Sequence, residues 1–186
     1  MSTNRSKIAM PAHFPAELYQ AAGRIQLLLS DVDGCWTDGT ITFDRDGSES
    51  VTFYAHDGYG VKQAQLAGIE VVVISGRNNP AVVARAKQLG VKEIHVGIAD
   101  KTELARQLVK ARGFSPSQVA ALGDDLPDHP LFDAAALTFA PPQATAAILQ
   151  RADHVTQADA GRGAVREVCD ILVAARGDFS PRAGTQ

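Results

Sequence analysis

The sequence predicts an α/β fold in which helices cover both faces of a doubly wound parallel sheet. Short runs rich in Val, Ile and Leu alternate along the chain with segments of helical spacing, as parallel strands and their crossover helices do. The run "IEVVVISG" at residues 69–76 is almost continuously apolar, as expected of a strand that is covered on both faces. A hydrophobic content of 45% in 186 residues supplies a core for one domain of ordinary size.

The N-terminal part of the predicted domain contains a strand and then a β-hairpin. The first strand and its end are "IQLLLSDVD" at residues 25–33, where an apolar run breaks into acidic residues. Residues 40–55 read as a hairpin, because two β-rich runs flank the tight-turn pair Asp46-Gly47.

Helices and strands then alternate to the end of the predicted core. Residues 58–68 have helical spacing and end at Gly68, and residues 79–90 form a second helix with Pro80 in its first turn and Gly90 at its end. Further strands are predicted at residues 92–97, 119–125, 136–140 and 153–156, and further helices at residues 100–113, 126–135, 141–152 and 163–177. The result is a Rossmann-like sheet with a hairpin insertion and without a cap domain.

Length, charge and cysteine content narrow the class of protein. We expect one domain over residues 1–186, with a core of about residues 25–176 and a tail at each end. Residues 178–186 in the C-terminal tail are expected to be mobile. A formal net charge of −3 disfavours a nucleic-acid partner, and no apolar run approaches the length of a membrane span. With two cysteines and no apolar leader, a reducing cytoplasm is the expected location.

Polar residues lie where predicted strands end, and this pattern predicts a shared site. They are Asp31 with Asp33, Ser75 to Arg77, the segment 97–101 that ends in Lys101, and Asp124 to Asp128. Parallel strands present their carboxyl ends at one edge of the sheet, where ligands bind. Taken singly, each of these residues is better explained by a turn, a cap or a solvated helix start. Together, the crowded carboxylates need a cation, and oxygen ligands suit Mg²⁺ with a phosphate.

Motifs at these strand ends resemble a known superfamily. "DVDGCWTDG", "VISGR", Lys101 and "GDDLPD" are similar, in this order, to the four motifs of the haloacid dehalogenase superfamily, and the resemblance spans roughly residues 25–176. "DGYG" and "GRGAVREVCD" resemble the corresponding segments of the 3-deoxy-D-manno-octulosonate 8-phosphate phosphatase family.

This resemblance implies a role for each catalytic residue. Asp31 would be the nucleophile that forms an aspartyl-phosphate. Asp33 would protonate the leaving oxygen and then activate water. Ser75 would hydrogen-bond the phosphoryl oxygens, and Lys101 would offset their charge.

The resemblance also implies a Mg²⁺ site. Its ligands would be Asp31, the backbone carbonyl of Asp33, and Asp124. Asp125 and Asp128 would lie nearby and orient Lys101 or metal-bound waters.

The substrate-binding residues follow from the same resemblance. They would be Asp33, Tyr54, Ala55, His56, Asp57, Gly58, Lys62, Arg77, Arg85 and Lys101. Arg77 and Arg85 have the charge to bind an anionic sugar acid, although Arg85 could equally lie on a solvated helix face. The family usually has Arg where this chain has His56, which lacks the guanidinium fork, so the exact sugar phosphate stays open.

We therefore predict a Mg²⁺-dependent phosphatase that acts on a phosphorylated sugar acid, with 3-deoxy-D-manno-octulosonate 8-phosphate as the leading substrate. The resemblance places such an enzyme in lipopolysaccharide biosynthesis. It also implies a homotetramer in which hairpins assemble and neighbouring chains close the sites. The alternatives are a phosphatase for another sugar phosphate, such as a nonulosonate 9-phosphate, or a non-catalytic sugar-phosphate-binding regulatory domain.

Overall fold

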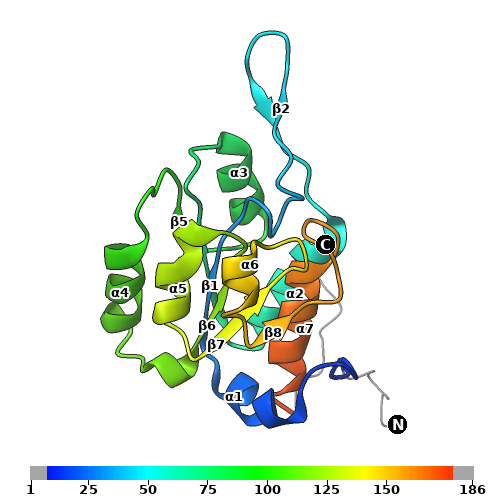
Figure 1. The fold of residues 1–186 in the computed structure, drawn as a ribbon, viewed down its shortest axis with the longest axis vertical. Helices are drawn as coiled ribbons and strands as arrows, with labels where there is room; N and C mark the ends of the chain where they lie inside the picture. The colour runs from blue at the N-terminus through cyan, green and yellow to red at the C-terminus, as the bar shows by residue number, and fades with distance from the viewer. Residues whose placement is uncertain (1–7, 178–186) are drawn as a thin grey trace.

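The computed structural model describes residues 8–177, and its centre is a parallel sheet. Within these residues the sheet has six strands in the order β5-β4-β1-β6-β7-β8, and every neighbouring pair is parallel (Figure 1). Their bounds are β1 Leu27–Ser30, β4 Glu70–Ile74, β5 Glu93–His95, β6 Val119–Leu122, β7 Leu137–Ala140 and β8 His154–Val155. β4 lies on one side of β1 and β6 on the other, so the strand order reverses at β1. This reversal is the topological switch point, where ligands bind in such sheets.

Helices cover both faces of this sheet, as the sequence predicts. The helices are α1 Tyr19–Arg24, α2 Ala55–Leu66, α3 Pro80–Gln88, α4 Thr102–Ala111, α5 His129–Asp133, α6 Ala146–Leu149 and α7 Ala164–Ala174. Buried residues of α1, α2, α3 and α7 join one hydrophobic cluster, and those of α4, α5 and α6 join another on the opposite face. Alternation along the strands produces this division: Leu28 belongs to the first cluster, whereas Leu27 and Leu29 belong to the second.

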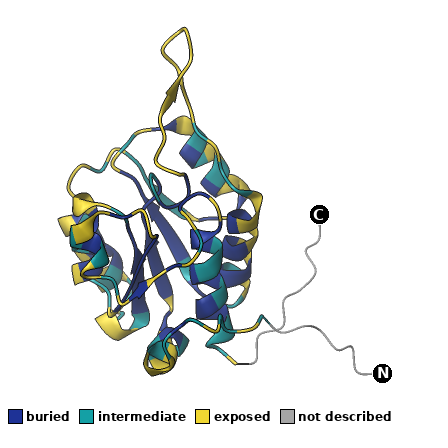
Figure 2. Cartoon of the chain, turned by 45° about the vertical axis from the view of Figure 1, so that its right-hand side comes forward, coloured by how far each residue is buried: buried dark blue, intermediate teal, exposed yellow. Residues whose placement is uncertain are grey.

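The hairpin insertion is present but shorter than predicted. Only β2, Thr42–Phe43, and β3, Glu49–Ser50, pair in an antiparallel register, although the prediction covered residues 40–55. Figure 2 shows it projecting from the domain, and all of residues 38–50 are exposed. With neither face packed in this chain, little besides the turn at Gly47, which has a φ of 82°, specifies its pairing.

Helix α2 begins at Ala55, three residues before its predicted start at residue 58. The N-cap residue is Tyr54, which is not a capping residue type and whose side chain makes no capping hydrogen bond, so no start signal marks this position. The helix is also packed against both α7 and β4, which removes the one-sided pattern by which helices are recognised.

Residues before Ile25 also pack on the domain. A 3₁₀ turn at Ala16–Leu18 leads into α1, and both Phe14 and Ala22 are buried in the cluster beneath α7. The tail expected at residues 178–186 lies outside the described residues. No helix in residues 8–177 combines the length and the apolar character needed to cross a membrane.

Candidate active site

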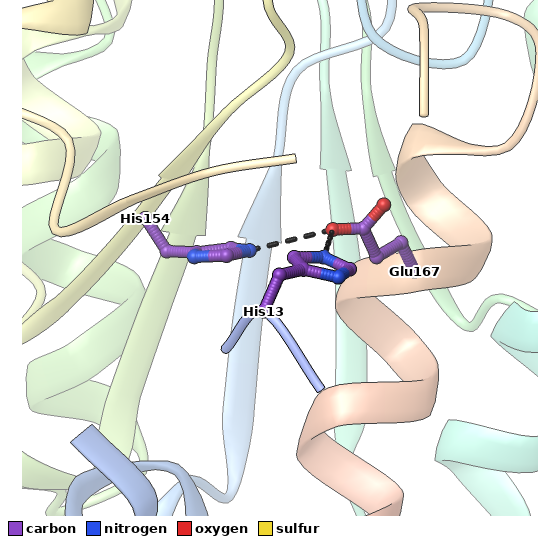
Figure 3. A group of neighbouring side chains, drawn as sticks. All are labelled: His13, His154 and Glu167. Carbon is purple, nitrogen blue, oxygen red and sulfur yellow. Dashed lines mark hydrogen bonds and ion pairs between the residues drawn. The ribbon is translucent and has the colours of Figure 1, made fainter. Parts of the chain in front are cut away.

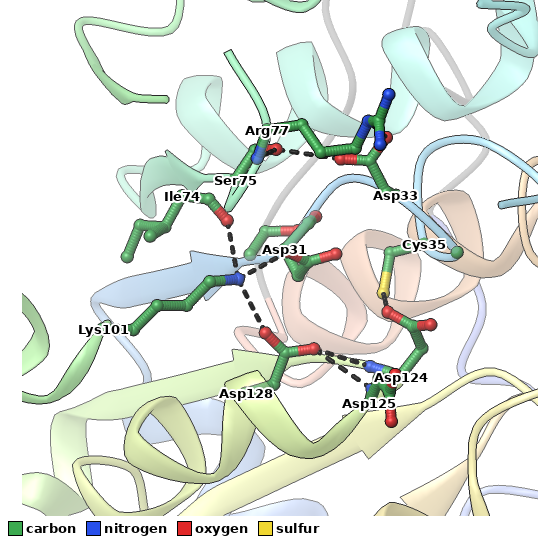
Figure 4. Close-up of polar contacts among 12 residues, drawn as sticks. Asp31, Asp33, Cys35, Ile74, Ser75, Arg77, Lys101, Asp124, Asp125 and Asp128 are labelled. Atoms are coloured by element: carbon green, nitrogen blue, oxygen red, sulfur yellow. Dashed lines mark hydrogen bonds and ion pairs between the residues drawn. The ribbon is translucent and has the colours of Figure 1, made fainter. Parts of the chain in front are cut away.

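The predicted catalytic and metal-binding residues converge at the carboxyl ends of β1, β4 and β6. Register explains this, because Ser30 at the end of β1 pairs with Val73 of β4 and with Leu122 of β6. The residues that follow each strand therefore emerge side by side (Figure 4). They line a cavity of about 190 Å³ formed by Asp31, Asp33, Gly76, Arg77, Lys101, Asp124, Asp125, Pro127 and Asp128.

Lys101 is the buried cation at the centre of this cavity. Its Nζ donates hydrogen bonds to Asp31 Oδ1 at 2.5 Å, to Asp128 Oδ1 at 2.7 Å and to the carbonyl oxygen of Ile74 at 3.0 Å. Its side chain is only 1% exposed. Burial alone would lower the pKa of Lys101, but the charges of Asp31 and Asp128 outweigh burial and raise this pKa, so the ammonium stays protonated.

The Lys101 ammonium does not fully compensate the negative charge that Asp31 and Asp124 carry when both are ionised. Burial, followed by the neighbouring Asp128 carboxylate, raises the pKa of Asp31 well above its ordinary value. The same causes, with Asp125 added, raise the pKa of Asp124 to about 7. Several acids around one lysine create a strong demand for a further cation at this position.

Ligand atoms of Asp31, Cys35 and Asp124 all lie within 4.8 Å of one another, which is compatible with a bound metal ion. Burial raises the pKa of the Cys35 thiol well above its ordinary value, so the thiol stays protonated, with its Sγ 3.9 Å from Asp124 Oδ1. Because a neutral thiol is a poor metal ligand, the carboxylates set the preference, and they favour a hard divalent ion such as Mg²⁺.

Backbone geometry brings Asp124 close to the loop after β1. Gly34 has a φ of 86°, and a Cβ atom there would lie 2.2 Å from Asp124 Oδ2. Only glycine therefore allows this approach. Asp128 holds the backbone of residues 124–125 in place. Its Oδ2 accepts hydrogen bonds from the backbone N–H groups of Asp124 and Asp125 at 2.9 and 3.3 Å.

Asp33 lies on the opposite side of the cavity, against residues that follow β4. Ser75 Oγ donates to Asp33 Oδ2 at 2.8 Å, and Arg77 Nε lies 4.0 Å from Asp33 Oδ1. Arg77 also forms an ion pair of 2.7 Å with Glu49 of the hairpin. Glu49 was not among the predicted site residues, because it is one of three exposed acids in the hairpin and no motif surrounds it.

The predicted substrate-binding residues divide between different places. Arg77 lines the cavity with the catalytic residues, whereas Ala55, Gly58, Lys62 and Arg85 line another pocket of about 250 Å³ between α2 and α3, together with Tyr59 and Leu89. A Cβ atom at Gly58 would lie 2.4 Å from Arg85 Nη2, so a larger residue there would displace the Arg85 guanidinium.

Other members of the predicted set have different surroundings. The exposed His56 ring packs beside Tyr54, with ring centroids 4.9 Å apart. Asp57 is buried, and its Oδ1 accepts a hydrogen bond of 2.8 Å from the backbone N–H of Arg166 at the start of α7. This bond links "DGYG" to "GRGAVREVCD", so the two family-specific segments form one structural unit.

Comparisons with known proteins agree with this architecture. The model of the haloacid dehalogenase-like hydrolase family matches residues 93–168. The 3-deoxy-D-manno-octulosonate 8-phosphate phosphatase of Escherichia coli K12 is 38% identical over 169 residues, which cover 91% of this chain and 90% of that protein. The chain belongs to this phosphatase family.

Solved structures extend the comparison to the fold. The Moraxella catarrhalis phosphatase, a complex with magnesium, phosphate and 3-deoxy-D-manno-octulosonate, superposes with a TM-score of 0.84 at 37% identity, covering 88% of this chain and 94% of that one. The cobalt-bound Haemophilus influenzae phosphatase superposes with a TM-score of 0.80 at 35% identity, covering 84% and 92%. The predicted Rossmann-like α/β sheet and the predicted family are confirmed.

Proposed function

We propose that this chain is a Mg²⁺-dependent phosphatase that hydrolyses 3-deoxy-D-manno-octulosonate 8-phosphate. The observation that carries the proposal is the buried arrangement of Asp31 and Lys101 beside Asp124, in a chain of this family. The relatives named above act on this substrate or bind its sugar. They give no support to a nonulosonate 9-phosphate phosphatase or to a non-catalytic domain.

Asp31 and Asp33 perform the covalent chemistry in this proposal. An Asp31 carboxylate oxygen attacks phosphorus, the bond from phosphorus to the sugar oxygen breaks, and Asp33 gives that oxygen a proton. Asp33 then removes a proton from water, which attacks phosphorus. The bond between Asp31 and phosphorus breaks, so inorganic phosphate leaves and the carboxylate is regenerated.

Lys101 and Ser75 assist this exchange. Lys101 holds Asp31 in place through its hydrogen bond of 2.5 Å and offsets the negative charge of the phosphoryl group. Ser75 now donates its hydroxyl hydrogen to Asp33, so its proposed hydrogen bond to a phosphoryl oxygen requires an exchange of partners.

Asp31, Asp124 and the backbone carbonyl of Asp33 are the residues proposed to hold Mg²⁺. The ion would supply positive charge that stabilises the attacking and transferring oxygens. The uncompensated carboxylates described above support this assignment, because Lys101 alone does not neutralise them.

Assembly and location are part of the same proposal. We propose a homotetramer, because the projecting hairpin exposes Ile41 and Phe43, which are 44% and 63% exposed, and because the pocket with Lys62 and Arg85 lies outside the catalytic cavity of its own chain. A neighbouring chain that covers the catalytic cavity would bring such a pocket to it. The buried free cysteines Cys35 and Cys169 support a reducing cytoplasm.

A screen of phosphate esters tests the function. The purified protein should release inorganic phosphate from 3-deoxy-D-manno-octulosonate 8-phosphate in the presence of Mg²⁺, and release should stop when the ion is chelated. Other sugar phosphates serve as the comparison. Faster hydrolysis of a nonulosonate 9-phosphate would reassign the substrate. If the protein hydrolysed no phosphate ester, the proposed phosphatase activity would be refuted.

A further inference from the structure

Away from the catalytic cavity, His13, His154 and Glu167 converge on one point (Figure 3). His13 Nε2 lies 2.7 Å from Glu167 Oε1, and His154 Nε2 lies 3.3 Å from the same oxygen. The three residues come from the segment before α1, from β8 and from α7. Their ligand atoms all lie within 4.8 Å of one another, and the cluster shares no residue with the active site.

Packing holds the two imidazoles in position. The His13 and His154 rings stack with centroids 5.5 Å apart and planes inclined by 20°. The rings of Phe14 and Phe139 form T-shaped pairs with the His154 ring, with centroids 5.1 and 6.0 Å apart, and the His154 side chain is only 5% exposed. Both rings are therefore oriented before any ligand binds, while His13, at 26% exposure, leaves an approach from solvent.

Glu167 is held ionised at the centre of the cluster. Burial favours the neutral acid, but hydrogen bonds from His154, His13 and the backbone N–H groups of Ala158 and Gln157 lower its pKa to about 2. In residues 8–177 its ion-pair partners are these two histidines, with no Lys or Arg in that role. A permanent negative charge thus faces two imidazoles and no fixed cation.

We propose that His13, His154 and Glu167 form a binding site for Zn²⁺ or a similar transition-metal ion. Two imidazole nitrogens and one carboxylate oxygen are a ligand set that Zn²⁺ prefers, and a fourth position remains for water. Ligands of a tetrahedral Zn²⁺ lie about 3.3 Å apart, given metal–ligand distances of about 2.0–2.1 Å. The observed separations of 2.7 and 3.3 Å need only a small expansion.

Binding changes the protonation of the cluster in a defined way. A neutral imidazole carries one hydrogen, so when Nε2 binds the ion the hydrogen between Nε2 and Glu167 is given up to solvent and the ring carries its one hydrogen on Nδ1 instead. The N–H groups of Gln157 and Ala158 continue to orient the carboxylate, as outer hydrogen bonds do in metal sites. Mg²⁺ is a poor competitor here because it prefers oxygen ligands and octahedral geometry.

The ion would join three segments that are far apart in the sequence. It would fasten the N-terminal segment to β8 and α7, and it would also hold residues 157–161, which precede α7. Gly161 N donates to the carbonyl oxygen of Cys35 at 3.0 Å, so this segment supports the loop that carries Asp31 and Asp33. The expected consequence is greater stability of the folded chain.

Zn²⁺ titration of the full chain in excess Mg²⁺ tests the proposal, because Mg²⁺ would fill the carboxylate site proposed for it. Isothermal titration calorimetry should give one tight Zn²⁺ per chain, and Zn²⁺ should raise the melting temperature. His13→Gln should lower the affinity at least about 100-fold, since loss of even an outer hydrogen bond costs 10–100-fold. Co²⁺ should give the visible absorption of a tetrahedral ion in the wild type but not in His13→Gln.

His95→Gln is the matched control, because His95 forms a similar pair with Glu93 at 2.9 Å but has no second histidine beside it. This variant should bind Zn²⁺ like the wild type. His154→Gln is a second test variant, which removes the buried histidine and should also weaken Zn²⁺ binding. If His154→Gln does not fold, His13→Gln alone still tests the proposal. Equal Zn²⁺ affinity in the wild type and His13→Gln, or no binding by the wild type, would overturn the proposal.

Discussion

Ser75 Oγ donates a hydrogen bond of 2.8 Å to Asp33 Oδ2 and so connects the loop after β4 to the loop after β1. The backbone N–H of Arg77 donates to the same Oγ at 3.1 Å, which fixes the direction of the serine hydroxyl. The side chain proposed as general acid and base is thus oriented by the neighbouring strand. Its partner Asp31 is held separately, by Lys101 on the other side of the cavity.

Asp31→Asn should abolish hydrolysis while preserving the fold. The amide has nearly the same shape as the carboxylate but lacks its nucleophilic charge. Loss of a catalytic nucleophile lowers kcat by at least about 10⁴-fold. Phosphate release and circular dichroism measure the two effects. Asp38→Asn is the control, because Asp38 is exposed and should leave kcat unchanged. Near-normal turnover by Asp31→Asn would remove Asp31 from its proposed role.

Asp124→Ala should raise the Mg²⁺ concentration that gives half-maximal activity. The substitution removes a carboxylate proposed to bind the ion, and we expect an increase of at least about tenfold. Activity measured across a Mg²⁺ titration gives this value for the wild type and the variant. Asp133→Ala, which removes an exposed acid that does not line this cavity, is the control and should leave this concentration unchanged. Full wild-type activity in excess chelator would contradict the metal requirement.

The strands that carry the site could be predicted because their sequences are unambiguous. The apolar runs of β1 and β4 are buried along almost their whole length, and the acids that follow β1 mark its carboxyl end. Convergence of Asp31, Ser75, Lys101 and Asp124 then follows from parallel topology alone. The order of the motifs showed which predicted element carries each site residue, because each motif ends a strand or starts a helix.

Contacts made across different elements could not be predicted in this way. The ion pair of Arg77 with Glu49 depends on the direction in which the exposed hairpin leaves the domain, and no periodicity encodes that direction. Asp57 lies in a family motif, yet its hydrogen bond to the N–H of Arg166 depends on the packing of α2 against α7. The packing of Phe14 and the His13 cluster was missed because the segment before α1 has no regular pattern.

Arg77→Ala should distinguish a sugar-acid phosphate from a generic phosphate ester. Arg77 lines the catalytic cavity, and its guanidinium is suited to a substrate carboxylate. Losing one charge-assisted hydrogen bond costs about 1.5–3 kcal/mol, or roughly 10-fold to more than 100-fold in kcat/KM. An ester without a carboxylate, such as p-nitrophenyl phosphate, should be almost unaffected. Equal losses on both substrates would refute the carboxylate role.

Arg85→Ala provides a related test of the pocket between α2 and α3. If a neighbouring chain brings this pocket to a catalytic cavity, the variant should show the same substrate-dependent loss as Arg77→Ala. Lys87→Ala, which removes another cation from the same helix, is the control. Unchanged kinetics on the sugar-acid phosphate would place Arg85 outside the substrate site.

Phe43→Asp should lower assembly and activity together. Phe43 is 63% exposed at the hairpin, and a charge there would disfavour burial against another chain. Light scattering should show a shift from tetramer to smaller species, with a parallel fall in turnover of the sugar-acid phosphate. Leu66→Asp, an exposed apolar residue at the far end of α2, is the control. A wild-type chain that is monomeric and fully active would refute closure by neighbouring chains.

Asp57→Asn should change how the free energy of unfolding depends on pH. Burial raises the pKa of Asp57 from 3.8 to about 6, and its Oδ2 has no hydrogen-bond partner in the described residues. The folded chain therefore binds this proton more tightly, so the stabilisation is complete below about pH 4 and is lost as the pH rises through about 6. Its size is on the order of 3 kcal/mol. Urea unfolding across this range should show the wild type losing stability relative to Asp57→Asn, and parallel curves would contradict the raised pKa.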